Sequence, residues 1–133
     1  MIWLISIFMV LAFEGKENVT LDDLRWKNRV VLYFPSQDQN PKFDLKSLEE
    51  EFKERKIIFL SIGVRFTTNS EANFHQDYLK SLHDKYASKK SNWVLIGLDG
   101  GVKLKSDDGL DWALIFKTID SMPMRQSEIR KSS

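Results

Sequence analysis

The hydrophobic pattern of the chain is dominated by three runs that are apolar at nearly every position. They cover residues 29–34, 57–62 and 93–98 and are rich in β-branched and aromatic side chains. A continuous apolar run is typical of a strand that is buried on both faces of a sheet. Residues 102–105 instead alternate between apolar and polar, which predicts an edge strand with one buried face.

Between these strands, apolar residues recur every three or four positions, which is the spacing of one helix face. This pattern predicts helices over residues 41–54 and 70–88, a last helix that runs through residues 112–119, and a short helix or turn over 20–26. Residues 64–70 lack either pattern and are predicted to form a loop.

Polar residues at the expected helix starts support these boundaries. Thr20 and Asp23 have the spacing of a capping box. Asn40 precedes Pro41, and this pair suits the cap and the first position of a helix. Ser70 is the expected cap of the helix that follows the loop.

The last helix is expected to begin at a cap supplied by Asp107 or Asp108. Pro123 is expected to end it, which leaves residues 125–133 as a polar tail. Asp-Gly-Gly at 99–101 predicts a tight hairpin between two antiparallel strands.

The order of the elements predicts the fold. Long strand–helix–strand connections favour parallel pairs, and the hairpin adds an antiparallel pair. We therefore expect a mixed four-stranded sheet with helices on both faces, which is the thioredoxin-like three-layer α/β/α sandwich. The length of 133 residues fits one such domain, and we assign it to residues 13–133.

The first twelve residues are interpreted separately. Residues 2–13 read IWLISIFMVLAF, with Ser6 as the only polar side chain. The run is too short to span a membrane and fits the apolar region of a cleaved signal peptide, although no basic residue precedes it. We expect residues 1–12 to be a signal peptide and the protein to be exported, periplasmic or secreted. The alternatives are a membrane anchor, as an uncleaved segment, or a buried strand.

Composition narrows the classes of function. Twenty basic residues face nineteen acidic ones, so the net charge of +1 offers no footprint for nucleic acid. The chain contains no cysteine, which excludes thiol–disulfide chemistry by this chain. His75 and His83 lie too far apart on one helix to share a metal ion. We find no motif of a hydrolase or nucleotide enzyme, and no metal or cofactor is expected.

A first group of candidate binding residues follows the first buried strand. In a thioredoxin-like fold the reactive group lies there, but here the loop offers only polar side chains. A serine in this place has no evident base to take its proton. A polar loop at a helix start can bind an anion, and the alternative is simple capping and turn formation. The candidates in this loop are Ser36, Gln37 and Asn40.

A second group of candidates follows the last predicted helix. Arginines there could hold a carboxylate through paired hydrogen bonds, and methionines adapt to irregular apolar partners. In the structural alternative the methionines fill the end of the core and Arg125 pairs with Asp120 or Glu128. The candidates in this stretch are Met122, Met124, Arg125 and Arg130.

Two segments carry a family resemblance. Residues 95–104 (LIGLDGGVKL) and 119–130 (IDSMPMRQSEIR) resemble a bacterial family of unknown function that is related to the DUDES domains of vertebrate sushi-repeat extracellular proteins. The resemblance extends over about residues 21–130. It implies a thioredoxin-like fold, distant similarity to peroxiredoxins and an exported location, and it implies no catalytic residues.

The sequence thus favours a non-catalytic module that binds a protein or a small ligand. The alternative is an enzyme of unrecognised type, or a stress protein related to peroxiredoxins, that uses the polar loop at 36–40. A purely structural, self-associating domain is a third possibility.

Overall fold

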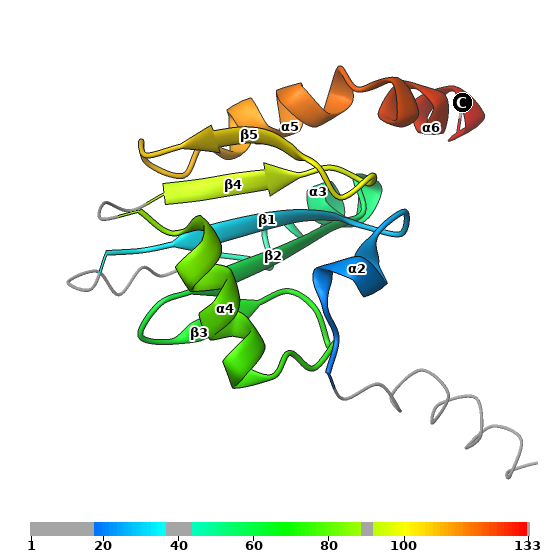
Figure 1. Cartoon of the computed structure of the whole chain (residues 1–133). Helices are drawn as coiled ribbons and strands as arrows, with labels where there is room; N and C mark the ends of the chain where they lie inside the picture. Colours follow the sequence, from blue (N-terminus) through cyan, green and yellow to red (C-terminus); the bar gives the residue numbers. More distant parts are fainter. Residues whose placement is uncertain (1–17, 37–43, 89–91, 133) are drawn as a thin grey trace, which may run out of the picture.

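The computed structural model describes residues 18–36, 44–88 and 92–132. Figure 1 shows the helices and strands along the chain. Their bounds are α2 (Leu21–Leu24), β1 (Arg29–Phe34), α3 (Glu49–Glu54), β2 (Ile57–Ile62), β3 (Phe66–Thr68), α4 (Gln76–Tyr86), β4 (Asn92–Ile96), β5 (Val102–Ser106), α5 (Trp112–Asp120) and α6 (Pro123–Ser132).

The five strands form one sheet in the order β3-β2-β1-β4-β5. β1 runs parallel to β2, whereas the pairs β1–β4, β2–β3 and β4–β5 are antiparallel. Every residue of β1, β2 and β4 is buried, as the continuous apolar runs predict.

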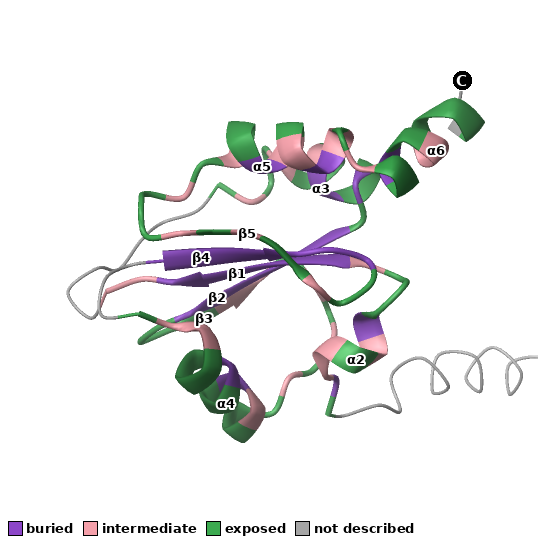
Figure 2. Cartoon of the chain, turned by 45° about the horizontal axis from the view of Figure 1, so that its top comes forward, coloured by how far each residue is buried: buried purple, intermediate pink, exposed green. Residues whose placement is uncertain are grey.

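Helices cover both faces of the sheet, and Figure 2 shows α3, α5 and α6 on one side and α2 and α4 on the other. Alternate strand residues therefore enter two separate cores. On the α4 side the core includes Val30, Leu32, Leu60, Leu79, Leu82 and Val94. On the α5 side it includes Val31, Phe52, Phe59, Trp93, Ile115 and Ile119. The mixed α/β three-layer prediction is confirmed at this level.

The predicted number of strands is wrong, because residues 64–70 contain a fifth strand. β3 is only three residues long and pairs with the end of β2 between Ile62↔Phe66 and Leu60↔Thr68. A run this short carries no readable pattern. β3 also reverses the chain direction before α4. β4 therefore runs antiparallel to β1, whereas the sequence predicted a parallel pair. The crossover through α4 thus connects two strands of like direction, β3 and β4.

Three helix starts also differ from the prediction. α3 begins at Glu49, and residues 45–48 form turns in place of the predicted helix. α4 begins at Gln76, and its cap is His75, whose Nδ1 accepts the Asp77 N–H at 3.1 Å. Ser70 instead closes a local turn, because its hydroxyl accepts the Ala72 N–H at 3.0 Å. α5 is capped by Asp111, whose Oδ1 accepts the Leu114 N–H at 3.0 Å, and not by either aspartate predicted.

The chain after Pro123 is a helix, α6, and not the predicted tail. A proline inside a helix interrupts it. Proline also suits the first position of a new helix, because an N–H at that position would have no helical partner. The predicted start at Asn40 and Pro41 lies outside the described residues.

Two turn predictions are confirmed. The Thr20 N–H donates to Asp23 Oδ2 at 2.9 Å, which closes the start of α2 as the capping box predicts. At the β4–β5 hairpin, Asp99 Oδ1 accepts the Gly101 N–H at 2.9 Å, and Gly100 has a φ of 85°. That φ favours glycine, and it explains the residue at this position.

The proposed signal peptide, residues 1–12, lies outside the described residues. Within the described ranges, no helix has the length and apolar character needed to cross a membrane.

Asn92 holds the end of α4 to the start of β4. Its side chain is fully buried, its Oδ1 accepts the Ser88 N–H at 3.0 Å, and its Nδ2 donates to the Tyr86 carbonyl at 3.0 Å. The amide thus satisfies two backbone groups that the helix end leaves without helical partners.

We expect Asn92→Ala to lower the free energy of unfolding by about 2 kcal/mol, because both backbone groups lose their partner in a buried place. Urea unfolding followed by circular dichroism measures the change. Asn73→Ala is the control, since the Asn73 side chain is exposed. Equal midpoints for the two variants would contradict this role of Asn92.

Candidate functional site

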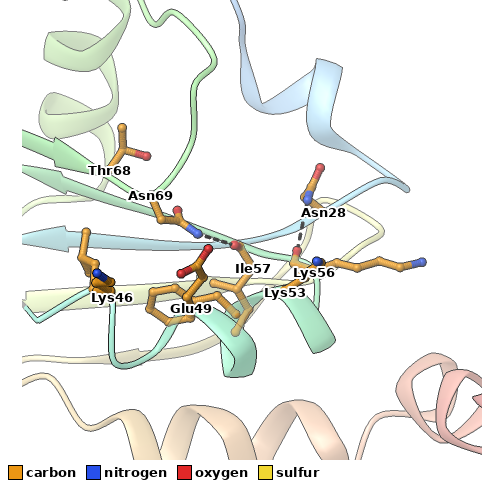
Figure 3. A pocket seen from close by; sticks show the side chains of 10 residues that line it. Asn28, Lys46, Glu49, Lys53, Lys56, Ile57, Thr68 and Asn69 are labelled. Atoms are coloured by element: carbon orange, nitrogen blue, oxygen red, sulfur yellow. Dashed lines mark hydrogen bonds between the residues drawn. The ribbon is translucent and has the colours of Figure 1, made fainter.

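A groove of about 600 Å³ runs between α3 and the edge of β2 and β3. Its floor is apolar and includes Leu45, Phe52 and Ile57. Figure 3 shows the polar side chains around it, with Thr68 and Asn69 on the strand side.

The strand side of the groove is held rigidly by two asparagines. Asn69 Oδ1 accepts the Phe59 N–H at 2.8 Å, and its Nδ2 donates to the Ile57 carbonyl at 3.0 Å. The amide thus pairs with the part of the β2 edge that β3 is too short to reach. Asn28 Nδ2 donates to the Lys56 carbonyl at 3.3 Å at the other end.

Three lysines and one glutamate follow the helix side of the groove. Glu49 and Lys53 lie on α3, Lys46 in the turn before it and Lys56 just after it, and all four line the groove. All four are exposed, and none has an ion-pair partner among the described residues. The groove therefore combines an apolar floor with a net positive rim.

The spacing of these lysines is a signal that the sequence contains, although it was not among the predicted sites. Charged runs on a helix usually form a solvated face, so spacing alone does not distinguish this rim. The role of Asn69 has no sequence signal, because it depends on where β3 ends.

A second polar cluster lies at the junction of α3, α5 and α6. Asp120 accepts from Arg55 Nε at 3.0 Å and Nη2 at 2.9 Å, and from Arg125 Nε at 3.1 Å. Arg55 Nη1 also donates to Glu51 Oε2 at 2.6 Å, and its guanidinium lies 4.6 Å from the centre of the Phe116 ring.

The same cluster includes a buried arginine at the start of β1. Arg29 is 1% exposed, and its Nη1 donates to the Arg55 carbonyl at 2.9 Å and to Glu128 Oε1 at 3.1 Å. Its Nε and Nη2 are buried and have no hydrogen-bond partner among the described residues. We call Arg29, Arg55, Asp120, Arg125 and Glu128 the arginine cluster.

The ion pairs of the arginine cluster shift the pKa values of Asp120 and Arg55. Burial by itself raises the pKa of Asp120, but hydrogen bonds from Arg55 and Arg125 outweigh it and leave the pKa lowered. Burial likewise opposes the charge of Arg55, yet its bonds to Asp120 and Glu51 leave its pKa raised. Both groups therefore stay charged in the folded protein at neutral pH.

The candidates in the C-terminal stretch have different places. Arg125 is buried and bonded to Asp120, and its Nη1 donates to the Glu54 carbonyl at 3.1 Å, so the structural alternative holds for this residue. Met122 packs against the core on the α5 side. Met124 and Arg130 lie exposed on α6, so the four residues do not form one surface.

Of the candidates after β1, only Ser36 is described, and it is half-buried just beyond the strand. Gln37 and Asn40 lie outside the described residues. The two histidines are both exposed on the α4 side and are eight residues apart. In the described part of the chain, no group of three metal-ligating side chains is found.

The sheet order and the two helical layers define a thioredoxin-like α/β protein. The fold is similar to the crystal structure of reduced Plasmodium vivax 2-Cys peroxiredoxin, with a TM-score of 0.57 and 19% identity over 82% of this chain and 85% of that chain. The chain belongs to the family described as domain of unknown function DUF4174, which matches residues 20–128. A comparison with curated proteins gives no match.

We expect the Asp120 ion pairs to make stability depend on acid pH. The pKa of Asp120 is lowered from 3.8, so its pairs stabilise the fold above that pH and are lost as the pH falls through the lower folded pKa. Asp120→Asn should cost about 2 kcal/mol at neutral pH, with allowance for partial exposure.

Urea unfolding of the wild type and Asp120→Asn between neutral pH and pH below the ordinary value of 3.8 tests this expectation. The difference between the two proteins should shrink as the pH falls. Asp108→Asn is the control, because Asp108 is exposed and has no ion pair in the described structure. A difference that is constant with pH would contradict the assignment.

Proposed function

We propose that this chain is an exported, non-catalytic binding module whose groove beside α3 binds an organic anion with an apolar body. The observation that carries this proposal is the rim of Lys46, Lys53 and Lys56, which has no ion-pair partners in the described structure, above a floor of apolar side chains. Apolar clefts with a few fixed polar groups are typical ligand sites.

The chemistry of the groove supports binding instead of catalysis. A nucleophile needs a base within hydrogen-bond reach. The Thr68 hydroxyl accepts the Ser70 N–H at 3.1 Å, and the Asn69 amide is occupied by the backbone of β2. The chain also has no thiol to serve the peroxiredoxin-like scaffold.

Export rests on the apolar sequence of residues 1–12. The relation to the DUDES domains of extracellular proteins is part of the same proposal, since it would place the family outside the cell. The second candidate function is an enzyme of unrecognised type that acts through the loop at 36–40. The similarity of the fold to a peroxiredoxin supports this candidate.

Binding of anilinonaphthalenesulfonate, an aromatic sulfonate, tests the groove. We expect the variant Lys46→Gln/Lys53→Gln/Lys56→Gln to bind it at least about tenfold more weakly, because three charge contacts of about 0.5–1 kcal/mol each are lost. Dye fluorescence during titration gives the dissociation constants.

Two controls distinguish binding in the charged groove from non-specific binding of the dye to the protein surface. Replacing Lys27, Lys80 and Lys117 by glutamine removes the same charge from exposed positions outside the groove. N-phenylnaphthylamine has a similar apolar body without the sulfonate, so its weaker binding should not respond to either set of changes. If both triple variants weaken the sulfonate equally, the groove is not its site.

Export predicts that the mature protein starts near Phe13, because a signal peptidase would read the small residues before it. N-terminal sequencing of the protein purified from the envelope fraction of its native cells measures this directly. An intact Met1 on protein from the cytoplasmic fraction would contradict the proposal.

A further inference from the structure

Trp26 has a strained backbone conformation and a side chain that gains little from folding. Its φ of 68° lies in the left-handed region, directly after the C-cap residue of α2, where glycine or asparagine is preferred. Its side chain is 58% exposed and belongs to neither core. The bond from the Trp26 N–H to the Leu98 carbonyl at 2.6 Å explains the backbone shape, yet a glycine would form it equally well.

The indole lies next to Arg25, whose guanidinium forms no ion pair with a described residue. The guanidinium carbon of Arg25 lies 5.7 Å from the centre of the Trp26 ring, and the Arg25 stem runs close to Gly100. Arg25 has no carboxylate partner among the described residues. Its donors therefore remain available to a ligand.

Arg25 lines a second hollow, of about 630 Å³, between α2, α4 and the β4–β5 hairpin. α2 and α4, which border this hollow, cover the face of the sheet opposite α3, which borders the lysine-rimmed groove (Figure 2). Its wall also includes Asp22, whose carboxylate has no ion-pair partner in the described ranges, and Tyr78. The Tyr78 hydroxyl accepts the Leu21 N–H at 2.7 Å, which leaves its own proton to donate.

The hollow contains charges of both signs beside aromatic rings. Lys85, over the ring of Tyr86 at 5.2 Å, adds a second cation, and Asp99 adds a second carboxylate that is fixed by Lys103 at 2.8 Å. An anion would meet two carboxylates there, and an apolar ligand would leave the polar groups unpaired.

A neutral sugar satisfies all of these groups. Its neighbouring hydroxyls can donate to a carboxylate and accept from a guanidinium, and its C–H face can stack on an indole. We propose that the hollow between α2, α4 and the hairpin is a saccharide site, with Asp22, Arg25 and Tyr78 as hydrogen-bonding residues. Trp26 does not line the hollow itself, but its ring contacts Arg25, and we assign it as the stacking residue for a sugar that extends past Arg25. This site is independent of the groove beside α3.

Titration of the full chain with chitotriose and with maltotriose, followed by NMR of the indole N–H groups, tests the proposal. At least one of the two sugars should shift the Trp26 signal, which Trp26→Phe identifies, with a dissociation constant near about 1 mM. The Trp112 signal, on the other face of the sheet, should not move. Absence of any Trp26 shift with both sugars would overturn the proposal.

Variants inside and outside the hollow test whether the sugar binds there. Asp22→Asn and Arg25→Gln should each weaken the sugar at least about tenfold, a loss of one charge-assisted hydrogen bond. Asp108→Asn, Arg65→Gln and the triple lysine variant of the groove should bind it as the wild type does. Unchanged affinity in both Asp22→Asn and Arg25→Gln would place the sugar elsewhere and overturn the assignment.

The stability of Trp26→Gly separates a binding role from a structural one. The variant should lose the sugar while its melting temperature equals or exceeds that of the wild type, since glycine relieves the positive φ. A clear fall in melting temperature would show that the indole serves the fold, and would overturn its role as a stacking residue.

Discussion

The central strand of this protein begins with an arginine whose charge lies inside the fold, and the arrangement of the C-terminal helices depends on it. A buried guanidinium is costly unless it is paired. Among the described residues, the carboxylate that pairs with Arg29 is that of Glu128, ninety-nine residues later in the chain. α6 must therefore fold back over the start of β1, and Asp120 at the end of α5 fixes the turn by pairing with Arg55 and Arg125.

The arginine cluster does not involve the loop after β1, the groove beside α3 or the hollow between α2 and α4. The arginine cluster lies at the start of β1, whereas the loop in which thioredoxin-like proteins hold a reactive thiol follows its end at Phe34. The absence of cysteine from this chain therefore leaves the arginine cluster untouched. The lysine-rimmed groove borders α3 and the hollow lined by Arg25 borders α2 and α4, on opposite faces of the sheet, so the two proposed sites share no side chain.

The sequence predicted the parts of the fold that local pattern controls. The three apolar runs gave β1 and β2 with their observed bounds and β4 to within two residues, and Asp-Gly-Gly at 99–101 gave the hairpin. β3 was missed because three residues hold no pattern, and α6 was missed because Pro123 can both end and begin a helix. Of the candidate sites, the lysine rim leaves a spacing in the sequence that does not by itself distinguish it from a solvated face, and the hollow depends on contacts between three distant elements.

The arginine cluster also changes the meaning of the C-terminal motif. Arg125 and Glu128 belong to the segment that carries the family resemblance, and both side chains face inward to Asp120 and Arg29. A motif of this kind reports a requirement of folding, because a buried charge and its partner must be kept together. In this fold, a recognisable charged motif is therefore weak support for a ligand site. The residues that bind are better sought where side chains cost stability or lack partners, as Trp26 and the groove lysines do.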